Sequence, residues 1–354
     1  LFIITAISVF IVVLGLAFRA PLLSFIFGKV DADVMENSMV YFFYTVLSYP
    51  FIALYDAGAS IFRAQENTRG PMVISIISNV MNIVGNGILI WVFHMGVAGA
   101  AISTLVSRIF CAVVVLYQLR KDRQPIVVRD YLKIRPDGKM IGRILALGIP
   151  SGIENSMFQF GKLAIQSTVS TLGTTAIAAQ AMTNMLEMLN GTAVIGVGIG
   201  LMTVVGQSLG AGRKDEAVYY MKKLMIFSEV FLIACCAVVY VLARPITMIG
   251  GMEAKSAEMC LDMMFWITIV KPIVWMFAFI PAYGMRAAGD VKFSMITSCI
   301  TMWTFRFCLC VYLIRVCGMG PMAVWIGMFT DWTVRAIVFG LRFKSGKWME
   351  HKVV

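Results

Sequence analysis

Long runs of uncharged or nearly uncharged residues follow one another along this chain of 354 residues. A helix needs about 20 apolar residues to cross a hydrocarbon core about 30 Å thick, and inside lipid only helices or closed barrels satisfy every backbone polar group. Hydrophobic residues make up 60% of the chain, against about 45–50% in soluble domains. The sequence therefore predicts an all-α membrane protein with ten transmembrane helices, at residues 1–27, 38–62, 71–93, 95–119, 143–171, 175–209, 222–243, 258–285, 292–314 and 319–341.

The basic residues are concentrated in alternate loops between these runs. Twenty Lys and Arg residues fall in one set of loops and the C-terminal tail, whereas only five fall in the opposite loops. By the positive-inside rule the richer set faces the cytoplasm, which places both visible ends of the chain on that side of the plasma (inner) membrane. The net charge of +11 thus reflects membrane topology and does not indicate a nucleic-acid-binding surface.

The last four runs repeat the first four. The pattern from Pro50 to Ala64 recurs from Pro272 to Ala287, and residues 96–101 correspond to residues 320–325 at nearly the same offset. The fifth and sixth runs have no earlier partner, so two further helices are expected to precede Leu1, which gives twelve helices in two pseudo-symmetric lobes. Repeats of this kind are typical of transporters whose halves rock against each other.

A polar stretch between the fourth and fifth runs marks a domain boundary. It contains eight basic residues, together with Pro125 and Pro136. We predict an incomplete N-terminal lobe of four helices, a cytoplasmic linker, a C-terminal lobe of six helices and a cytoplasmic tail, at residues 1–120, 121–142, 143–342 and 343–354.

A glycine-rich motif ends the sixth run. Its positions Gly206, Gln207, Gly210, Gly212 and Arg213 resemble the hallmark of the multidrug and toxic compound extrusion (MATE) family. The opening of the fifth run and the last run are also similar to that family. The resemblance implies a non-enzymatic secondary transporter that exports xenobiotics by alternating access, with Na⁺ or H⁺ as the coupling ion and no other cofactor.

The physical role expected for the glycine motif is structural. Small residues allow close helix approach, and Gly212 can end the helix in a left-handed turn. The motif ends a helix instead of beginning one and lacks the Gly-Lys-Ser/Thr ending, so it does not indicate a phosphate-binding loop.

Charged residues inside the runs are the strongest candidates for functional residues, because placing a charge in hydrocarbon costs free energy. Glu154 lies eleven residues into its run and shares a helix face with Phe158 and Lys162. We predict that Glu154 and Asp331 bind the coupling cation or proton, whereas the alternative is that such charges only orient helices. The resemblance implies a coupling Glu about four residues further on, at Phe158, and a second coupling Asp on the missing first helix.

Polar side chains at helical spacing predict a substrate cavity. Amide groups form stripes on three helices, and two basic residues of later helices join them, with Asp331 or Glu154 as possible partners for Arg306. The alternative is that the amides form hydrogen bonds between helices. The predicted cavity residues are Asn79, Asn82, Asn86, Asn155, Phe158, Gln159, Lys162, Asn184, Glu187, Lys271 and Arg306.

Two prolines occupy equivalent places in the repeat. Pro50 and Pro272 each remove a backbone donor from a predicted helix. A shared hinge is predicted, with simple helix curvature as the alternative.

The predicted function is efflux of small amphipathic or cationic compounds across the lipid bilayer by a monomeric antiporter. With eight cysteines lacking a CxxC pair and only two histidines, no metal site is expected. The alternative is a flippase for lipid-linked saccharides with the same two-lobe plan, which would be expected to carry more arginines in its cavity. The sequence does not offer the convergent set of catalytic residues that an intramembrane enzyme would need.

Overall fold

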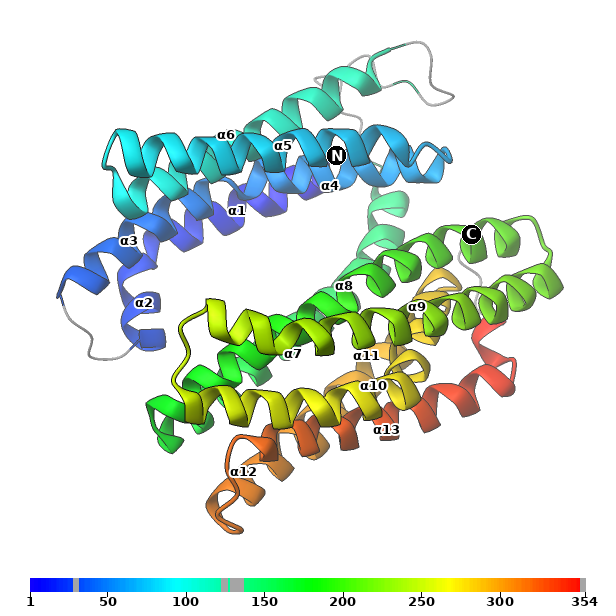
Figure 1. Ribbon diagram of the computed structural model, residues 1–354. Coiled ribbons are helices and arrows are strands. Elements are labelled where there is room, and N and C mark those ends of the chain that lie inside the picture. Colours follow the sequence, from blue (N-terminus) through cyan, green and yellow to red (C-terminus); the bar gives the residue numbers. More distant parts are fainter. Residues whose placement is uncertain (28–31, 122–126, 128–136, 351–354) are drawn as a thin grey trace. The chain divides into compact units, whose positions relative to one another are not determined.

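The computed structural model describes residues 1–27, 32–121, 127 and 137–350. These residues form helices joined by short turns, and the described part of the chain contains no β-strand. The prediction of an all-α protein is therefore confirmed. The chain divides into two compact units, Leu1–Ile141 and Gly142–Val354 (Figure 1).

In the first unit, α6 is the central helix and packs against α3, α4 and α5. Val115 and Leu119 of α6 are fully buried and form a core with Phe62 of α4 and Ile74 of α5. The helices of this unit are α1 (Phe2–Ala17), α2 (Arg19–Phe27), α3 (Ala32–Leu47), α4 (Tyr49–Ala64), α5 (Arg69–Gly87), a π-helical turn η1 (Ile88–Val92) and α6 (Gly96–Leu119).

In the second unit, α10 is the central helix and packs against α8, α9 and α13. Its Ile267, Ala278 and Met285 are fully buried. The elements of this unit are α7 (Gly138–Val169), η2 (Ser170–Leu172), α8 (Thr174–Gly210), α9 (Lys214–Ile249), α10 (Ala254–Ala287), α11 (Val291–Thr301), a π-helical segment η3 (Met302–Cys308), α12 (Leu309–Arg315), α13 (Met322–Lys344) and η4 (Lys347–Met349).

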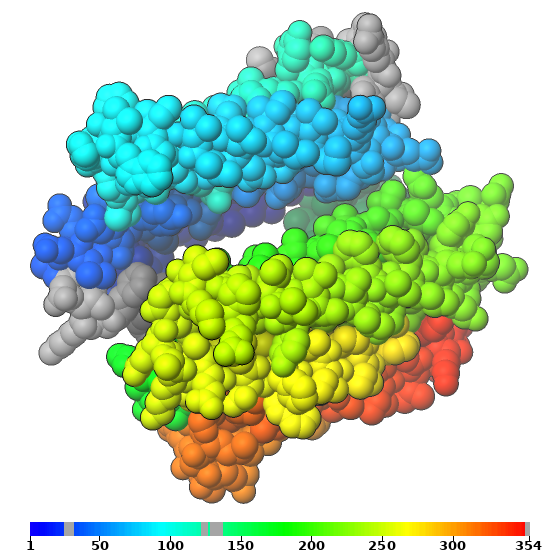
Figure 2. All heavy atoms as spheres, viewed as in Figure 1, coloured from blue at the N-terminus to red at the C-terminus, as the bar shows by residue number. Residues whose placement is uncertain are grey.

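The outer surface of the second unit is apolar along α9, which lies on the face of this unit turned to the reader in Figure 2. Phe227, Val230 and Val241 of this helix are more than half exposed. Exposed apolar side chains on a long helix are what contact with lipid requires, because the bilayer interior solvates them.

Eight helical segments of the described residues are long and apolar enough to cross a membrane, and each coincides with a predicted run. The first predicted run instead forms two short helices, because the chain turns at Phe18 between α1 and α2. The run at 143–171 forms α7, which has 32 residues but carries Glu154 and Lys162. It is therefore more polar than the eight membrane-crossing segments and is not one of them. The number of ten crossings thus stays a prediction.

The two predicted hinge prolines occupy different positions in their helices. Pro50 lies in the first turn of α4, directly after a break at Ser48, whereas Pro272 lies inside the unbroken α10. A proline in the first turn removes no helical hydrogen bond, since the donors there have no partner within the helix. Within the longer span Ala32–Ala64, however, Pro50 lies 18 residues after the start, as Pro272 does in the span Ala254–Ala287, so the two prolines occupy corresponding places and a shared hinge stays a prediction.

Candidate functional site in the second unit

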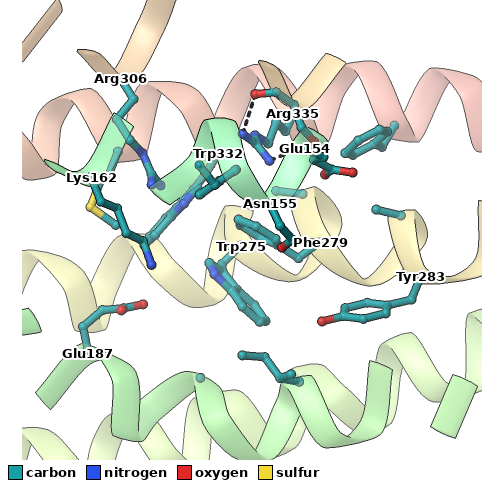
Figure 3. A pocket seen from close by; sticks show the side chains of 18 of the residues that line it. Glu154, Asn155, Lys162, Glu187, Trp275, Phe279, Tyr283, Arg306, Trp332 and Arg335 are labelled. Carbon is teal, nitrogen blue, oxygen red and sulfur yellow. Dashed lines mark hydrogen bonds between the residues drawn. The ribbon is translucent and has the colours of Figure 1, made fainter. Parts of the chain in front are cut away.

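The second unit contains a cavity of about 390 Å³, which is suited to a small molecule. The walls come from α7, α8, α10, α11, η3 and α13, so elements far apart in the sequence build it together (Figure 3). The lining residues are Glu154, Asn155, Phe158, Lys162, Glu187, Met188, Gly191, Ile195, Trp275, Ala278, Phe279, Ala282, Tyr283, Arg286, Ser298, Arg306, Met328, Trp332, Arg335 and Phe339.

Glu154 forms an ion pair across the cavity wall with Arg286, which is in the last turn of α10. Nη2 of Arg286 lies 2.7 Å from Oε1 of Glu154. The other carboxylate oxygen, Oε2, is buried and has no hydrogen-bond partner among the residues that the structure describes. An unsatisfied buried acceptor costs about 1–3 kcal/mol, and a hydrogen-bond donor or a cation at this oxygen would remove that cost.

Arg286 directly follows the predicted run at 258–285, which places it in a loop. In the structure α10 extends to Ala287, and Arg286 is three-quarters buried beside the Tyr283 ring, so it belongs to the helix and not to a loop. The long aliphatic stem of an arginine lets it occupy a helix end while its charged group reaches inward.

Glu187 on α8 forms an ion pair with Lys271 on α10. The Lys271 ammonium lies 2.5 Å from the carboxylate and 3.1 Å from the backbone oxygen of the same residue. Lys271 is fully buried and lies 5.3 Å from the centre of the Trp275 ring. The sequence predicted both charged residues but not their pairing, which joins positions 84 residues apart.

Asp331 on α13 lies between two guanidinium groups. Arg335, one turn further along the same helix, donates to Asp331 from Nε at 2.7 Å, and Arg306 places its Nε 3.2 Å from the other carboxylate oxygen. All three side chains are almost fully buried. Of the two partners that the sequence allowed for Arg306, the structure selects Asp331.

Aromatic rings line the cavity beside the same arginines. The Phe158 ring centre lies 5.3 Å from the guanidinium of Arg306 and 4.8 Å from that of Arg335. Trp275 and Phe279 stack with their centres 4.9 Å apart. Guanidinium groups over ring faces gain cation–π stabilisation, which helps to hold two like charges close together.

The π-helical segment η3 and a close helix contact place Arg306. A Cβ atom added at Gly327 of α13 would lie 2.8 Å from the backbone oxygen of Arg306, so only glycine permits this approach. A π-helical bulge inside a membrane helix is rare and occurs frequently at functional sites.

Five of the predicted cavity residues and one predicted coupling residue line this cavity. They are Asn155, Phe158, Lys162, Glu187, Arg306 and the predicted coupling residue Glu154. Lys271 and Asp331 lie directly behind the wall as partners of lining residues. Gln159 and Asn184 are exposed and are not among the residues that line it.

The predicted asparagine stripe lies on α5 in the first unit and is therefore not part of this cavity. Asn82 donates to Thr104 of α6 at 3.3 Å, and Asn86 donates to Asn82 at the same distance. These contacts match the alternative of hydrogen bonds between and along helices. Asn79 is exposed on the same helix.

The glycine motif ends α8 as the sequence predicted. Gly212 has a φ of 75° and follows the helix end, where Arg213 donates its backbone N–H to Ser208. Added Cβ atoms at Gly206 and Gly210 would meet no neighbour within 4 Å, so close helix approach does not explain these two glycines in the described part of the chain. Arg213 forms an exposed ion pair with Glu216.

The sequence interpretation did not assign Arg286, Arg335 and the ring residues of α10 to the cavity. The four-residue spacing of Asp331 and Arg335 was a usable signal, because residues at this spacing are neighbours on a helix. Trp275, Phe279 and Tyr283 are also spaced at one-turn intervals, but such rings usually fill a core.

The comparisons with known proteins agree with this architecture. A model of the MatE family matches residues 1–88 and 150–312. A probable multidrug resistance protein NorM from Thermotoga maritima is 25% identical over 343 residues, which is 93% of this chain and 71% of that protein. The probable multidrug resistance protein YoeA from Bacillus subtilis is 24% identical over 78% of this chain, which spans only 61% of that relative.

Solved structures show the same fold. A MOP superfamily transporter from Pyrococcus furiosus has a TM-score of 0.88 at 17% identity, covering 99% of this chain and 78% of that one. A MATE structure in complex with MaL6 has a TM-score of 0.86 at 18% identity, covering 98% of this chain and 78% of that one. With more than half of its residues matched by the family model, this chain belongs to the MatE family of multidrug efflux transporters, which are secondary transporters and not enzymes.

Proposed function

We propose that the protein exports small amphipathic compounds through alternating access, in exchange for Na⁺ or H⁺. The observation that supports coupling is the second oxygen of Glu154, which is buried at the cavity wall and finds no partner in the described part of the chain. A proton or Na⁺ at this position removes the cost of the unsatisfied acceptor. The cavity volume of about 390 Å³ accommodates a small substrate beside it.

Competition with Arg286 supplies the coupling in this proposal. A cation on Glu154 weakens its pair with Arg286, and Arg286 lies on a different helix from Glu154. The ion therefore stabilises conformations in which α7 and α10 are less tightly joined, and a ligand shifts an equilibrium by its differential affinity for the two states. Asp331 already has two guanidinium partners, so in this proposal it positions Arg306 and Arg335.

The first test is efflux by Glu154→Gln in vesicles that contain the complete protein. Glutamine keeps the size of the side chain but loses the negative charge that attracts the coupling ion. We expect efflux of a fluorescent substrate to fall at least about tenfold, which corresponds to a loss of about 1.4 kcal/mol. The matched control is Glu258→Gln, an exposed carboxylate of α10 outside the cavity, which should transport normally.

Imposed Na⁺ and H⁺ gradients identify the coupling ion in the same vesicles. One inwardly directed gradient should drive export by the unaltered protein, and Glu154→Gln should lose that dependence. Export by Glu154→Gln at the normal rate and with normal gradient dependence would contradict the role of Glu154. Export that ignores both gradients in the unaltered protein would contradict antiport.

A flippase for lipid-linked saccharides is the second candidate, and one observation favours it. Three arginines, Arg286, Arg306 and Arg335, line the cavity, where the sequence interpretation had expected such a flippase to carry several. Arginines bind phosphate groups with paired hydrogen bonds. Headgroup translocation by the complete protein in vesicles with a lipid-linked saccharide, without efflux of small compounds, would favour this candidate.

A further inference from the structure

The charges in and behind the cavity do not balance. Asp331 is shared by Arg306 and Arg335, and Glu154 is matched by Arg286. Glu187 pairs with Lys271, which leaves Lys162 as a further cation on the wall. Five basic groups thus meet three carboxylates. Removing a charge from water is costly unless it is paired, so the surplus favours a negatively charged occupant.

Lys162 is the first of the two cations that carry the surplus. It is exposed into the cavity from α7, and it has neither an ion pair nor a hydrogen bond with a residue that the structure describes. In Figure 3 it lies on the same side of the cavity as Glu187, which already accepts from Lys271. An accessible ammonium with three donors and no acceptor is available to a ligand.

Arg306 is the second cation. Its side chain is 4% exposed and lines the cavity, yet it donates no hydrogen bond to any described residue, and its Nε is unsatisfied despite the nearby Asp331. A buried guanidinium normally uses its planar set of donors on a carboxylate or phosphate. Apart from the Asp331 carboxylate, no described residue supplies an acceptor for these donors, and the Asp331 oxygen is too poorly aligned to satisfy Nε.

Aromatic side chains adjoin this basic end of the cavity. In Figure 3, Lys162, Arg306 and Glu187 lie on one side of the cavity, Glu154 and Tyr283 lie on the other, and the rings of Trp275, Phe279 and Trp332 lie between them. Flat rings provide apolar contact area for a planar molecule. The cavity thus combines a cationic end with an aromatic middle.

We propose that this cavity binds an amphipathic molecule with one anionic group, such as a carboxylate or sulfonate, carried on a flat apolar body. The anionic group lies between Lys162 and Arg306, and the apolar body lies against Trp275 and Phe279. This inference deepens the proposed function, because it assigns to the exporter an acidic substrate class instead of the cationic class expected from the sequence. It also covers an anionic lipid, which combines the same two chemical features.

Two probes of equal shape and opposite charge test the proposal. 2-Naphthalenesulfonate and trimethyl(2-naphthyl)ammonium are titrated into the complete protein in phosphatidylcholine nanodiscs, without any ion gradient, and binding is measured by calorimetry. We expect the sulfonate to bind at least about tenfold more tightly than the ammonium probe. Equal affinities, or tighter binding of the ammonium probe, would overturn the proposal.

A charge reversal at Lys162 tests whether the preference for the sulfonate over the ammonium probe arises in this cavity. Lys162→Glu should weaken binding of the sulfonate at least about tenfold and strengthen binding of the ammonium probe, because the change alters the local charge by two units. Lys255→Glu makes the same change at an exposed lysine of α10 outside the cavity and should leave both affinities unchanged. Sulfonate binding that is insensitive to Lys162→Glu, or equally sensitive to Lys255→Glu, would overturn the proposed location.

An experiment with an anionic lipid in the nanodiscs distinguishes the two possible sources of the anionic group. If phosphatidylglycerol in the nanodiscs competes with the sulfonate, and Lys162→Glu abolishes this competition, the natural occupant is an anionic lipid. If phosphatidylglycerol has no effect while the sulfonate binds, the occupant is a soluble compound. Both results support the anionic class. Because binding is measured without a gradient, failure of ion-coupled efflux would refute the proposed function and leave this inference intact.

Discussion

At the scale of single residues, the cavity wall depends on carboxylates that each hold buried cations. Asp331 is the clearest case, since its two oxygens face Arg335 and Arg306 and no part of its side chain is exposed. Removal of one member of such a group leaves charges buried without compensation, which is usually more damaging than replacing the whole group. The carboxylate is therefore required for stability whatever its part in transport.

Asp331→Leu should destabilise the purified protein by about 3–5 kcal/mol, because two guanidinium groups lose their shared partner. Thermal unfolding in detergent measures this effect. Asp331→Leu combined with Arg335→Leu should be less destabilised than Asp331→Leu alone. Asp262→Leu, at an exposed position of α10, is the control and should change the unfolding midpoint little. A double variant less stable than the single one would contradict the shared-partner interpretation.

Residue spacing explains which parts of the site the sequence could reveal. Asp331 and Arg335 are one turn apart, and Glu154, Phe158 and Lys162 follow one another at the same interval, so a helical reading places each set on one face. The pairs Glu154–Arg286 and Glu187–Lys271 join positions 132 and 84 residues apart. No local pattern encodes such pairs, because they depend on how the helices pack against one another.

At the scale of elements, the contact between α13 and η3 determines where Arg306 lies. Gly327 permits the backbone of Arg306 to approach α13, and the π-helical segment rotates the side chains that follow it. The apolar run at 292–314 indicated a helix, but hydropathy carries no information about an extra residue in one of its turns. The segment therefore could not be predicted from the sequence.

Gly327→Ala should destabilise the protein by about 1–3 kcal/mol, because the new methyl group would displace η3 from α13. Gly340→Ala is a matched control in the same helix, where an added Cβ meets nothing within 4 Å, and it should be neutral or stabilising. Thermal unfolding compares the two variants, and the sulfonate affinity of Gly327→Ala should fall as Arg306 moves. Equal unfolding midpoints would contradict the steric explanation.

At the scale of the whole molecule, composition predicted the helical class, and eight of the ten predicted runs form helices suited to a membrane. Hydropathy works at this scale because every segment in lipid must bury its backbone hydrogen bonds within itself. It failed at Phe18 and at Ser48, where the helices break within apolar runs, because apolar side chains report burial and not helix continuity.

Topology is testable with a cysteine of the natural sequence. Cys317 is exposed just after α12, in a connection that the charge distribution places outside the cytoplasm. A membrane-impermeant maleimide should label it in intact cells, and Cys317→Ser should abolish the labelling. In a Cys317→Ser background, Lys214→Cys at the start of α9 should be labelled only after the cells are permeabilised. The reverse pattern would contradict the predicted orientation.

The location of Arg286 has a consequence for the speed of any conformational change. Its guanidinium, which pairs with Glu154 of α7, belongs to the last turn of α10 and not to the middle of that helix. Terminal turns fray more readily than interior ones, since fewer hydrogen bonds hold them. Breaking this ion pair needs only a rotamer change of Arg286 or the unwinding of that one turn, so α7 can separate from the end of α10 while the buried core of the unit stays packed.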